Sequence, residues 1–168
     1  MSYQEKRTTV SIVTGALILA GYFSYALGEV QAGAVVPGDL KFWASTILIF
    51  IGIGIVATII IQIVFHILLS IAIAVQKTIE NENIGDKEIE RSVGAEIVED
   101  EMDKLIQLKS MRTGYFFAGF GFVIALLSLV LNYTPVVMLN ILFVSFIAGS
   151  IFEGFTQLYY YKKGFSHG

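Results

Sequence analysis

A single carboxylate stands inside an otherwise uncharged apolar part of the sequence. Glu153 lies in a long apolar run, and no other Asp or Glu falls within the four such runs of the chain. An ionisable side chain at membrane depth is energetically unfavourable and indicates a functional site by default. Counted from Pro135, Glu153 lies about 27 Å along a helix, near one surface of a bilayer. In the alternative interpretation, Glu153 has a purely structural role and pairs with Arg112 or with His66.

Polar residues recur at every fourth position in the second apolar run, so they share one helix face. These residues are Thr58, Gln62, His66 and Ser70. Gln62 lies roughly 30 Å from the start of this run, at the same depth as Glu153. Gln157 follows Glu153 by about one helical turn. We therefore predict one polar cluster, made of Glu153, Gln157, Gln62 and His66.

The predicted polar cluster could relay protons or bind a cation. A histidine side chain can change its charge near neutral pH, and Glu153 offers an anionic ligand. In the structural alternative, the same groups form hydrogen bonds between helices, each worth about 0.6 kcal/mol in a membrane. One histidine and one glutamate are too few for a transition-metal site. We expect neither a bound metal nor a cofactor.

A second group of carboxylates lies between the second and third apolar runs. On a helix, its members project from a shared face; they are Glu96, Glu99, Asp100 and Asp103. Beside them, apolar residues between positions 89 and 106 recur at helical spacing. Such a surface could dock a basic protein partner. The alternatives are a solvated helix, in which Asp100 pairs with Lys104, and a Ca²⁺ or Mg²⁺ site, although the spacing matches no EF-hand loop.

Four apolar runs must position these residues. A hydrocarbon core of roughly 30 Å needs about 20 apolar residues in a helix, and the runs span 8–28, 42–75, 113–131 and 136–161. Hydrophobic residues make up 55% of the 168 residues, more than a water-soluble domain needs. The predicted fold class is all-α: an integral membrane bundle of four transmembrane helices, in a single membrane domain over residues 1–168.

The second run is too long for one perpendicular crossing. A helix over residues 42–75 would reach roughly 50 Å, so we expect it to project beyond the membrane. The segment 77–111 would then be a cytoplasmic helical extension between the second and third transmembrane helices. No helix breaker falls between Glu96 and Arg112, so we expect the extension to run directly into the third span.

The basic residues indicate the orientation, because lysine and arginine are retained on the cytoplasmic side of a membrane. The chain has eleven lysine and arginine residues. Only Lys41 lies on the side of the membrane that would hold the short loops between the first and second runs and between the third and fourth runs. The others are Lys6, Arg7, Lys77, Lys87, Arg91, Lys104, Lys109, Arg112, Lys162 and Lys163. We therefore expect both termini in the cytoplasm. A signal peptide at the first run is the alternative, but Ser11, Thr14 and Ser24 suit helix packing there.

Small residues at helical spacing predict close approach between helices. In the first run these residues are Ser11 and Gly15, then Ala20, Ser24 and Gly28; in the second they are Gly52 and Gly54, and in the third Gly114, Gly119 and Gly121. These faces could pack within one chain or between chains of a homo-oligomer. The lipid bilayer is the expected partner in either arrangement.

The composition narrows the classes of function. The chain has no cysteine, which excludes a thiolate nucleophile and a Cys-based metal site. Its net charge of −3 provides no basic surface for nucleic acid. The sequence contains no nucleophile paired with a base, no His-rich metal set and no Gly-rich phosphate loop. An enzyme is therefore the least favoured class.

Two segments next to apolar runs carry a resemblance. Residues 99–112 read EDEMDKLIQLKSMR and lead into the third run, and residues 153–163 read EGFTQLYYYKK. Both resemble segments of a group of small prokaryotic four-helix membrane proteins of unknown function. The resemblance implies a bacterial plasma (inner) membrane and no particular chemistry. Some such proteins are regarded as partners of small transcriptional regulators.

Two functions remain. We expect a non-enzymatic membrane protein that acts as a regulatory, immunity-like or scaffolding partner through its acidic cytoplasmic helix, because this role requires nothing that the sequence lacks. The alternative is a small oligomeric channel or transporter for protons or cations, which would use the predicted polar cluster.

Overall fold

Four long helices make up most of the part of the chain that the computed structural model describes. They are α1 (Tyr3–Gln31), α2 (Leu40–Glu80), α4 (Glu101–Val130) and α5 (Pro135–Lys163). The described part of the chain contains no strand, and all four helices are long and apolar enough to cross a membrane. The predicted all-α fold with four candidate spans is confirmed. The structure describes residues 3–33, 36, 38–80, 91, 94, 98 and 100–164.

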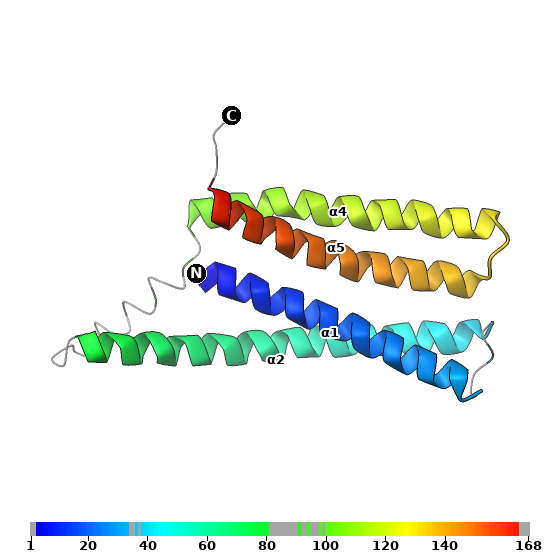
Figure 1. Ribbon diagram of the computed structural model, residues 1–168, viewed down its shortest axis with the longest axis horizontal. Coiled ribbons are helices and arrows are strands. Elements are labelled where there is room, and N and C mark those ends of the chain that lie inside the picture. The colour runs from blue at the N-terminus through cyan, green and yellow to red at the C-terminus, as the bar shows by residue number, and fades with distance from the viewer. Residues whose placement is uncertain are drawn as a thin grey trace.

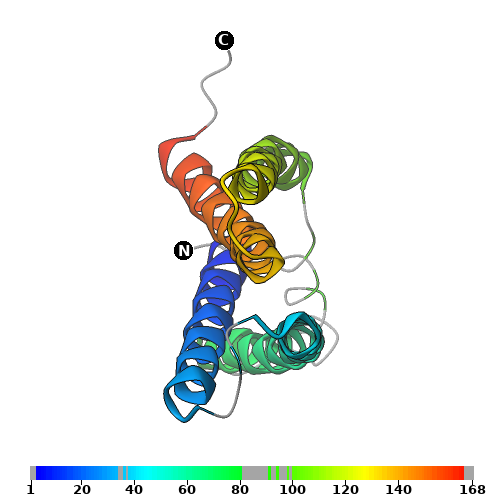
Figure 2. The ribbon, with the colours of Figure 1, turned by 90° about the vertical axis from the view of Figure 1, so that its right-hand side faces the viewer.

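The helices lie side by side, with α5 at the centre of the packing. α5 packs most extensively against α4, then against α1, and it also contacts α2, while α1 packs against α2. Figure 2 shows α4 and α2 on opposite sides, with α5 and α1 between them. Tyr3, Glu101 and Lys163 lie at one end of the bundle (Figure 1), which we name the termini end. The opposite end holds both short connections and is named the loop end.

Helix α2 is the longest element. Its 41 residues correspond to roughly 60 Å of helix, about twice the thickness of a hydrocarbon core. Figure 1 shows its C-terminal part reaching beyond the other three helices at the termini end. The prediction that this helix continues past Gln76 is confirmed as far as Glu80.

The acidic segment before α4 differs from the prediction of an uninterrupted helix. Asp100 has extended backbone angles and is the N-cap of α4, whose first residue is Glu101. The carboxylate of Asp100 accepts a hydrogen bond from the Asp103 backbone N–H at 2.6 Å, and Asp103 Oδ2 accepts one from the Asp100 backbone N–H at 3.1 Å. This reciprocal capping satisfies amides that lack partners in the first turn. In the predicted cytoplasmic extension 77–111, most of the residues before Asp100 lie outside the described part of the chain.

The predicted ion pair of Asp100 with Lys104 is also wrong. Lys104 Nζ lies 3.0 Å from Glu101 Oε1 instead. The reason is the start of the helix at Glu101: the Asp100 side chain turns back to cap the amide of Asp103, and Glu101 becomes the first acidic residue on the helix surface. After Glu101, α4 continues without interruption into its apolar part, as the sequence predicted.

Aromatic packing fills the loop end. The buried residues there are Tyr22, Ala26, Trp43, Val136 and Phe143. The Tyr22 ring lies 4.7 Å from the Phe143 ring, measured between centroids. Its hydroxyl donates to Asn140 Oδ1 at 2.5 Å. The loop end is therefore closed by side chains from α1, α2 and α5.

Glycines bring α4 and α5 into close contact. A Cβ atom added at Gly149 would lie 2.8 Å from the backbone oxygen of Gly114, closer than real Cβ contacts. The same approach places Glu153 Oε2 against Gly114. The predicted close helix approach is confirmed at Gly114, where it positions Glu153 on the inner side of α5. It is not found at Gly28, Gly52 or Gly119, where nothing lies within 4 Å of an added Cβ.

Candidate functional site: a polar cavity at the termini end

All four helices contribute to a polar cavity of about 280 Å³ near the termini end. Glu153, Gln157 and Gln62, three of the four residues of the predicted polar cluster, line it together. The other lining residues are Gln4, Arg7, Thr8, Ser11, Ile12, Thr58, Asp103, Gln107, Ser150, Gly154 and Tyr161. The cavity forms because each helix is mostly apolar and directs its few polar residues near the termini end toward the other helices.

The wall between α1 and α2 is built around Gln62. Its side-chain oxygen accepts a hydrogen bond from Arg7 Nε at 3.1 Å, and its Nε2 donates to Ser11 Oγ at 2.9 Å. Both partners lie on α1, one turn apart. The polar face of α2 therefore packs against the beginning of α1, and it brings a guanidinium group to the cavity wall.

The wall between α1 and α5 is a short chain of hydrogen bonds that ends at Glu153. The buried Thr8 hydroxyl donates to Gln157 Oε1 at 2.9 Å, and Gln157 Nε2 lies 3.4 Å from Glu153 Oε1. Thr8 thereby fixes the orientation of the Gln157 amide, with its N–H₂ toward the carboxylate. Glu153 is half-buried, and its other oxygen lies against Gly114.

A second carboxylate borders the cavity at the beginning of α4. Asp103 Oδ1 accepts a hydrogen bond from the Tyr161 hydroxyl at 3.0 Å, while its other oxygen caps the helix. The Tyr161 contact ties α4 to the end of α5. Arg7, Glu153 and Asp103 thus place one positive and two negative groups on the cavity wall, among the residues that the structure describes.

Gln4 brings a buried side-chain amide to the cavity wall. Its side chain is only 7% exposed and lines the cavity. Its Nε2 is buried and has no hydrogen-bond partner among the described residues. A buried donor without a partner is unfavourable by about 1–3 kcal/mol, and such groups in native structures commonly meet a ligand, an ion or water. A polar ligand in the cavity would satisfy this amide.

Sequence reasoning missed the contribution of the first helix. Gln4, Thr8 and Ser11 follow one another at helical spacing, and together with Arg7 they form a polar face at the start of α1. This helical spacing could have identified the polar face from the sequence alone. It was overlooked because these residues lie beside the charged N-terminus, where polar residues are common.

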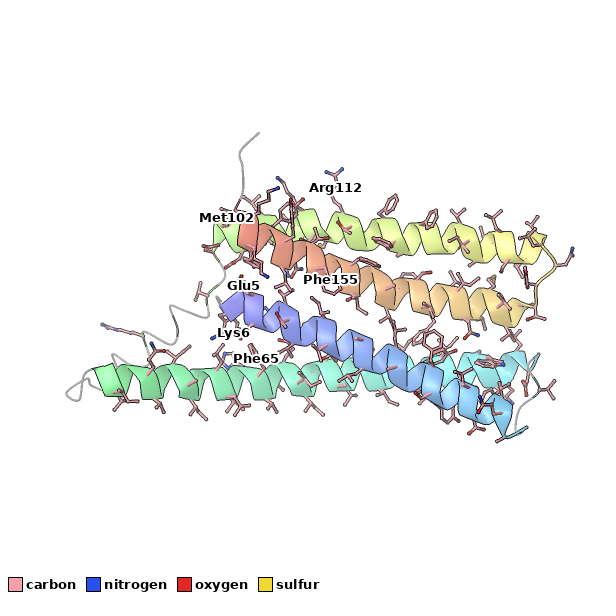
Figure 3. The ribbon with its side chains drawn as sticks, viewed as in Figure 1. Glu5, Lys6, Phe65, Met102, Arg112 and Phe155 are labelled. Carbon is pink, nitrogen blue, oxygen red and sulfur yellow. The ribbon has the colours of Figure 1, made fainter. Side chains whose placement is uncertain are left out.

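His66 and Arg112 lie away from Glu153. His66 lines a neighbouring groove with Tyr3, Arg7 and Gln62, where its ring stands edge-on to Tyr3 at a centroid distance of 6.3 Å. Figure 3 shows Arg112 pointing away from the other helices, on the outer face of α4. The structural alternative in which Arg112 pairs with Glu153 is therefore wrong.

The predicted docking residues fall into two groups. Glu96 and Glu99 lie outside the described residues. Asp100 and Asp103 are both engaged in the capping of α4, and Asp103 also contacts Tyr161. In the described part of the chain, no group of three or more His, Asp or Glu side chains could hold a metal ion.

An apolar groove of about 740 Å³ adjoins the polar cavity. It runs between α1, α2 and α5, toward the loop end. Ser11, Thr58, Gln62 and Ser150 border both spaces, so the two are continuous. The remaining walls are almost entirely apolar, with Ile18, Ile55 and Phe146 among them.

The chemistry of the polar cavity is that of a binding site for a small charged group. Glu153 can receive a cation or an amine, whereas Asp103 is engaged by the cap of α4 and by Tyr161, and Arg7 is engaged by Gln62. Comparison with known proteins adds no further constraint: no family model matches the chain, and neither a curated protein nor a solved structure matches it.

Proposed function

We propose that the protein is a multi-pass membrane protein of the transporter class that binds a cation or a protonated amine at Glu153. The observation that supports this most directly is the convergence of four helices on one polar cavity with Glu153 on its wall. Asp103 is engaged by the cap of α4 and by Tyr161, so Glu153 is the carboxylate of this cavity that we expect to receive a positively charged group. The buried, unpartnered amide of Gln4 offers a further polar contact to the bound solute.

The proposed orientation places the termini end in the cytoplasm of a bacterial plasma membrane. Ten of the eleven lysine and arginine residues support it. The polar cavity then lies on the cytoplasmic side, while aromatic packing closes the loop end. A solute would therefore enter from the cytoplasm, as in the inward-facing state of a carrier. Passage across the membrane would require this packing to open, or a pathway between the chains of a homo-oligomer.

The regulatory or scaffolding role through the acidic segment stays a prediction. It needs carboxylates that are accessible to a basic partner, and Asp100 and Asp103 already serve the start of α4. The polar cavity, by contrast, combines three predicted cluster residues with the buried Gln4 Nε2, which has no partner among the described residues. We therefore favour solute binding over docking.

Proton and cation flux into liposomes tests this proposal. We expect Glu153→Gln to reduce flux by about tenfold or more, because it removes the charge while keeping the shape of the side chain. Glu101→Gln is the matched control, since that side chain is 89% exposed and lies outside the cavity. Equal flux in wild type and Glu153→Gln, or no flux in either, would refute the proposed transport.

A further inference from the structure

We infer that two copies of the chain pair through the outer face of α2, side by side and with the same orientation in the membrane. We name this face the outer seam. It consists of Ile53, Ile60, Val64, Leu68, Ile71 and Val75. The outer seam borders neither the polar cavity nor the apolar groove, so it is a separate surface from the proposed solute site.

The outer seam is one continuous apolar stripe. Steps of three, four or seven residues keep its members on one side of the helix, and each residue is between 49% and 62% exposed. The opposite side of α2 contacts α1 through Gln62. Figure 2 shows α2 at one edge of the bundle, so the outer seam faces away from the other three helices.

Arg112 marks where the hydrocarbon ends on the side of the termini. It points outward from α4 (Figure 3), and an arginine that faces lipid places its guanidinium group among the headgroups. Neighbouring contacts carry this level across the bundle, from Gly114 to Glu153, from Gly154 to Ile12, and from Ser11 to Gln62. The headgroup level therefore passes close to Gln62 on α2.

Beyond this level, lipid tails no longer cover the outer seam. Leu68, Ile71 and Val75 lie roughly 9–20 Å past Gln62 along α2, toward the end that projects beyond the other helices (Figure 1). Apolar surface that leaves water contributes about 25 cal/mol per Å² to association. Within the hydrocarbon, by contrast, lipid covers Ile53 and Ile60 as well as protein would. The part beyond Gln62 therefore drives the pairing, and the part within the membrane aligns it.

A second copy is the partner that fits the whole outer seam. Copies with one orientation present identical seams at identical depth, so a two-fold axis along the membrane normal matches them, and the seam carries no charge that would repel its copy. Its residues offer roughly 600 Å² of apolar surface, at the lower limit of about 600–1,000 Å² per partner in stable interfaces. A water-soluble partner would find only the part beyond Gln62, about half of this surface, which is too small for a stable interface.

Disulfide crosslinking of the full chain in cell membranes tests the pairing. The chain has no cysteine, so each variant introduces a single thiol. We expect a mild oxidant to shift Ile60→Cys and Ile71→Cys from the monomer to the dimer band on a non-reducing gel. Ile59→Cys and Ala72→Cys are the matched controls and should stay monomeric, because each is an exposed neighbour turned by about 100° on the helix.

Equal crosslinking of seam and control variants would overturn the inference, because it would indicate random collision. Absence of a dimer in Ile71→Cys would overturn it as well, whether residues 81–99 of the same chain or another protein cover this part of α2. Ile71→Lys provides a second measurement: it sets like charges against each other, so it should raise the dimer dissociation constant by about tenfold or more, whereas Ala72→Lys should not. Equal dissociation constants in these two variants would also count against the pairing.

Discussion

Two buried polar residues on α1 differ in whether their side chains have a hydrogen-bond partner. Gln4 and Thr8 lie one turn apart and are buried to nearly the same degree, at 7% and 8% exposed. Thr8 donates to Gln157, whereas the Nε2 of Gln4 has no partner among the described residues. Burial without a hydrogen bond is unfavourable, so we expect Gln4 Nε2 to meet a group beyond the described residues. The indole N–H of Trp43 is in the same position at the loop end.

Substitutions at these two positions should change stability in opposite directions. We expect Gln4→Leu to raise the free energy of unfolding by up to about 1–3 kcal/mol in lipid-free detergent, because it removes an unsatisfied buried amide. Thr8→Val should lower it by about 1 kcal/mol, because the Gln157 carbonyl loses its donor. Thermal unfolding of the purified variants measures both.

The liposome flux assay separates the role of Gln4 from its effect on stability. If the Gln4 amide contacts the transported solute, Gln4→Leu should reduce flux although the protein itself is more stable. A Gln4→Leu variant that is less stable than wild type without ligand would show that the amide has a protein partner after all.

At the scale of elements, the α4–α5 pair provides the rigid support of the site. The two helices approach closely at Gly114 and Gly149, and Glu153 lies one turn beyond Gly149. The capped start of α4 also contacts the end of α5 through Asp103 and Tyr161. Small residues allow this approach in a membrane, where packing rather than the hydrophobic effect holds helices together.

Enlarging the glycine at this crossing should therefore weaken the bundle. We expect Gly149→Ala to destabilise the protein by about 1–3 kcal/mol, because the new methyl group meets the backbone oxygen of Gly114, which cannot move without shifting α4. Gly119→Ala is the control on α4, since nothing lies within 4 Å of its added Cβ. That variant should be neutral or slightly stabilising, because alanine favours helix by up to about 1 kcal/mol. Thermal unfolding in detergent compares them, and equal stability would argue against a tight crossing.

At the scale of the whole molecule, the two ends of the bundle differ in character. The loop end is closed by Tyr22, Trp43 and Phe143, and the termini end carries the polar cavity. Figure 1 shows that α2 also projects beyond the bundle at the termini end. A protein with one closed and one polar end presents different surfaces to the two sides of a membrane.

Cysteine labelling tests which end faces the cytoplasm. The chain has no cysteine, so Lys41→Cys at the loop end and Lys162→Cys at the termini end each introduce a single reactive thiol. We expect a membrane-impermeant thiol reagent to label Lys41→Cys in intact cells and Lys162→Cys only after permeabilisation, because of the distribution of basic residues. The reverse pattern would place the polar cavity on the outer side.

The four helices and their approximate limits could be predicted because apolar length is a local property of the sequence. The runs 113–131 and 136–161 fall largely within α4 and α5, and the extension of α2 past Gln76 follows from the absence of a breaker. The shared depth of Glu153 and Gln62 was also accessible, since helical rise alone converts residue number into depth.

Only the tertiary structure decided which of these residues face each other. Depth alone did not separate His66 from the cavity, because the rotation of α2 against α1 depends on how Gln62 meets Arg7 and Ser11. The start of α4 at Glu101 depends on a capping contact between Asp100 and Asp103, which the absence of a helix breaker did not reveal. The buried amide of Gln4 arises from packing between α1 and its neighbours. Periodicity within one helix determines a face, but the partner of that face depends on the other helices.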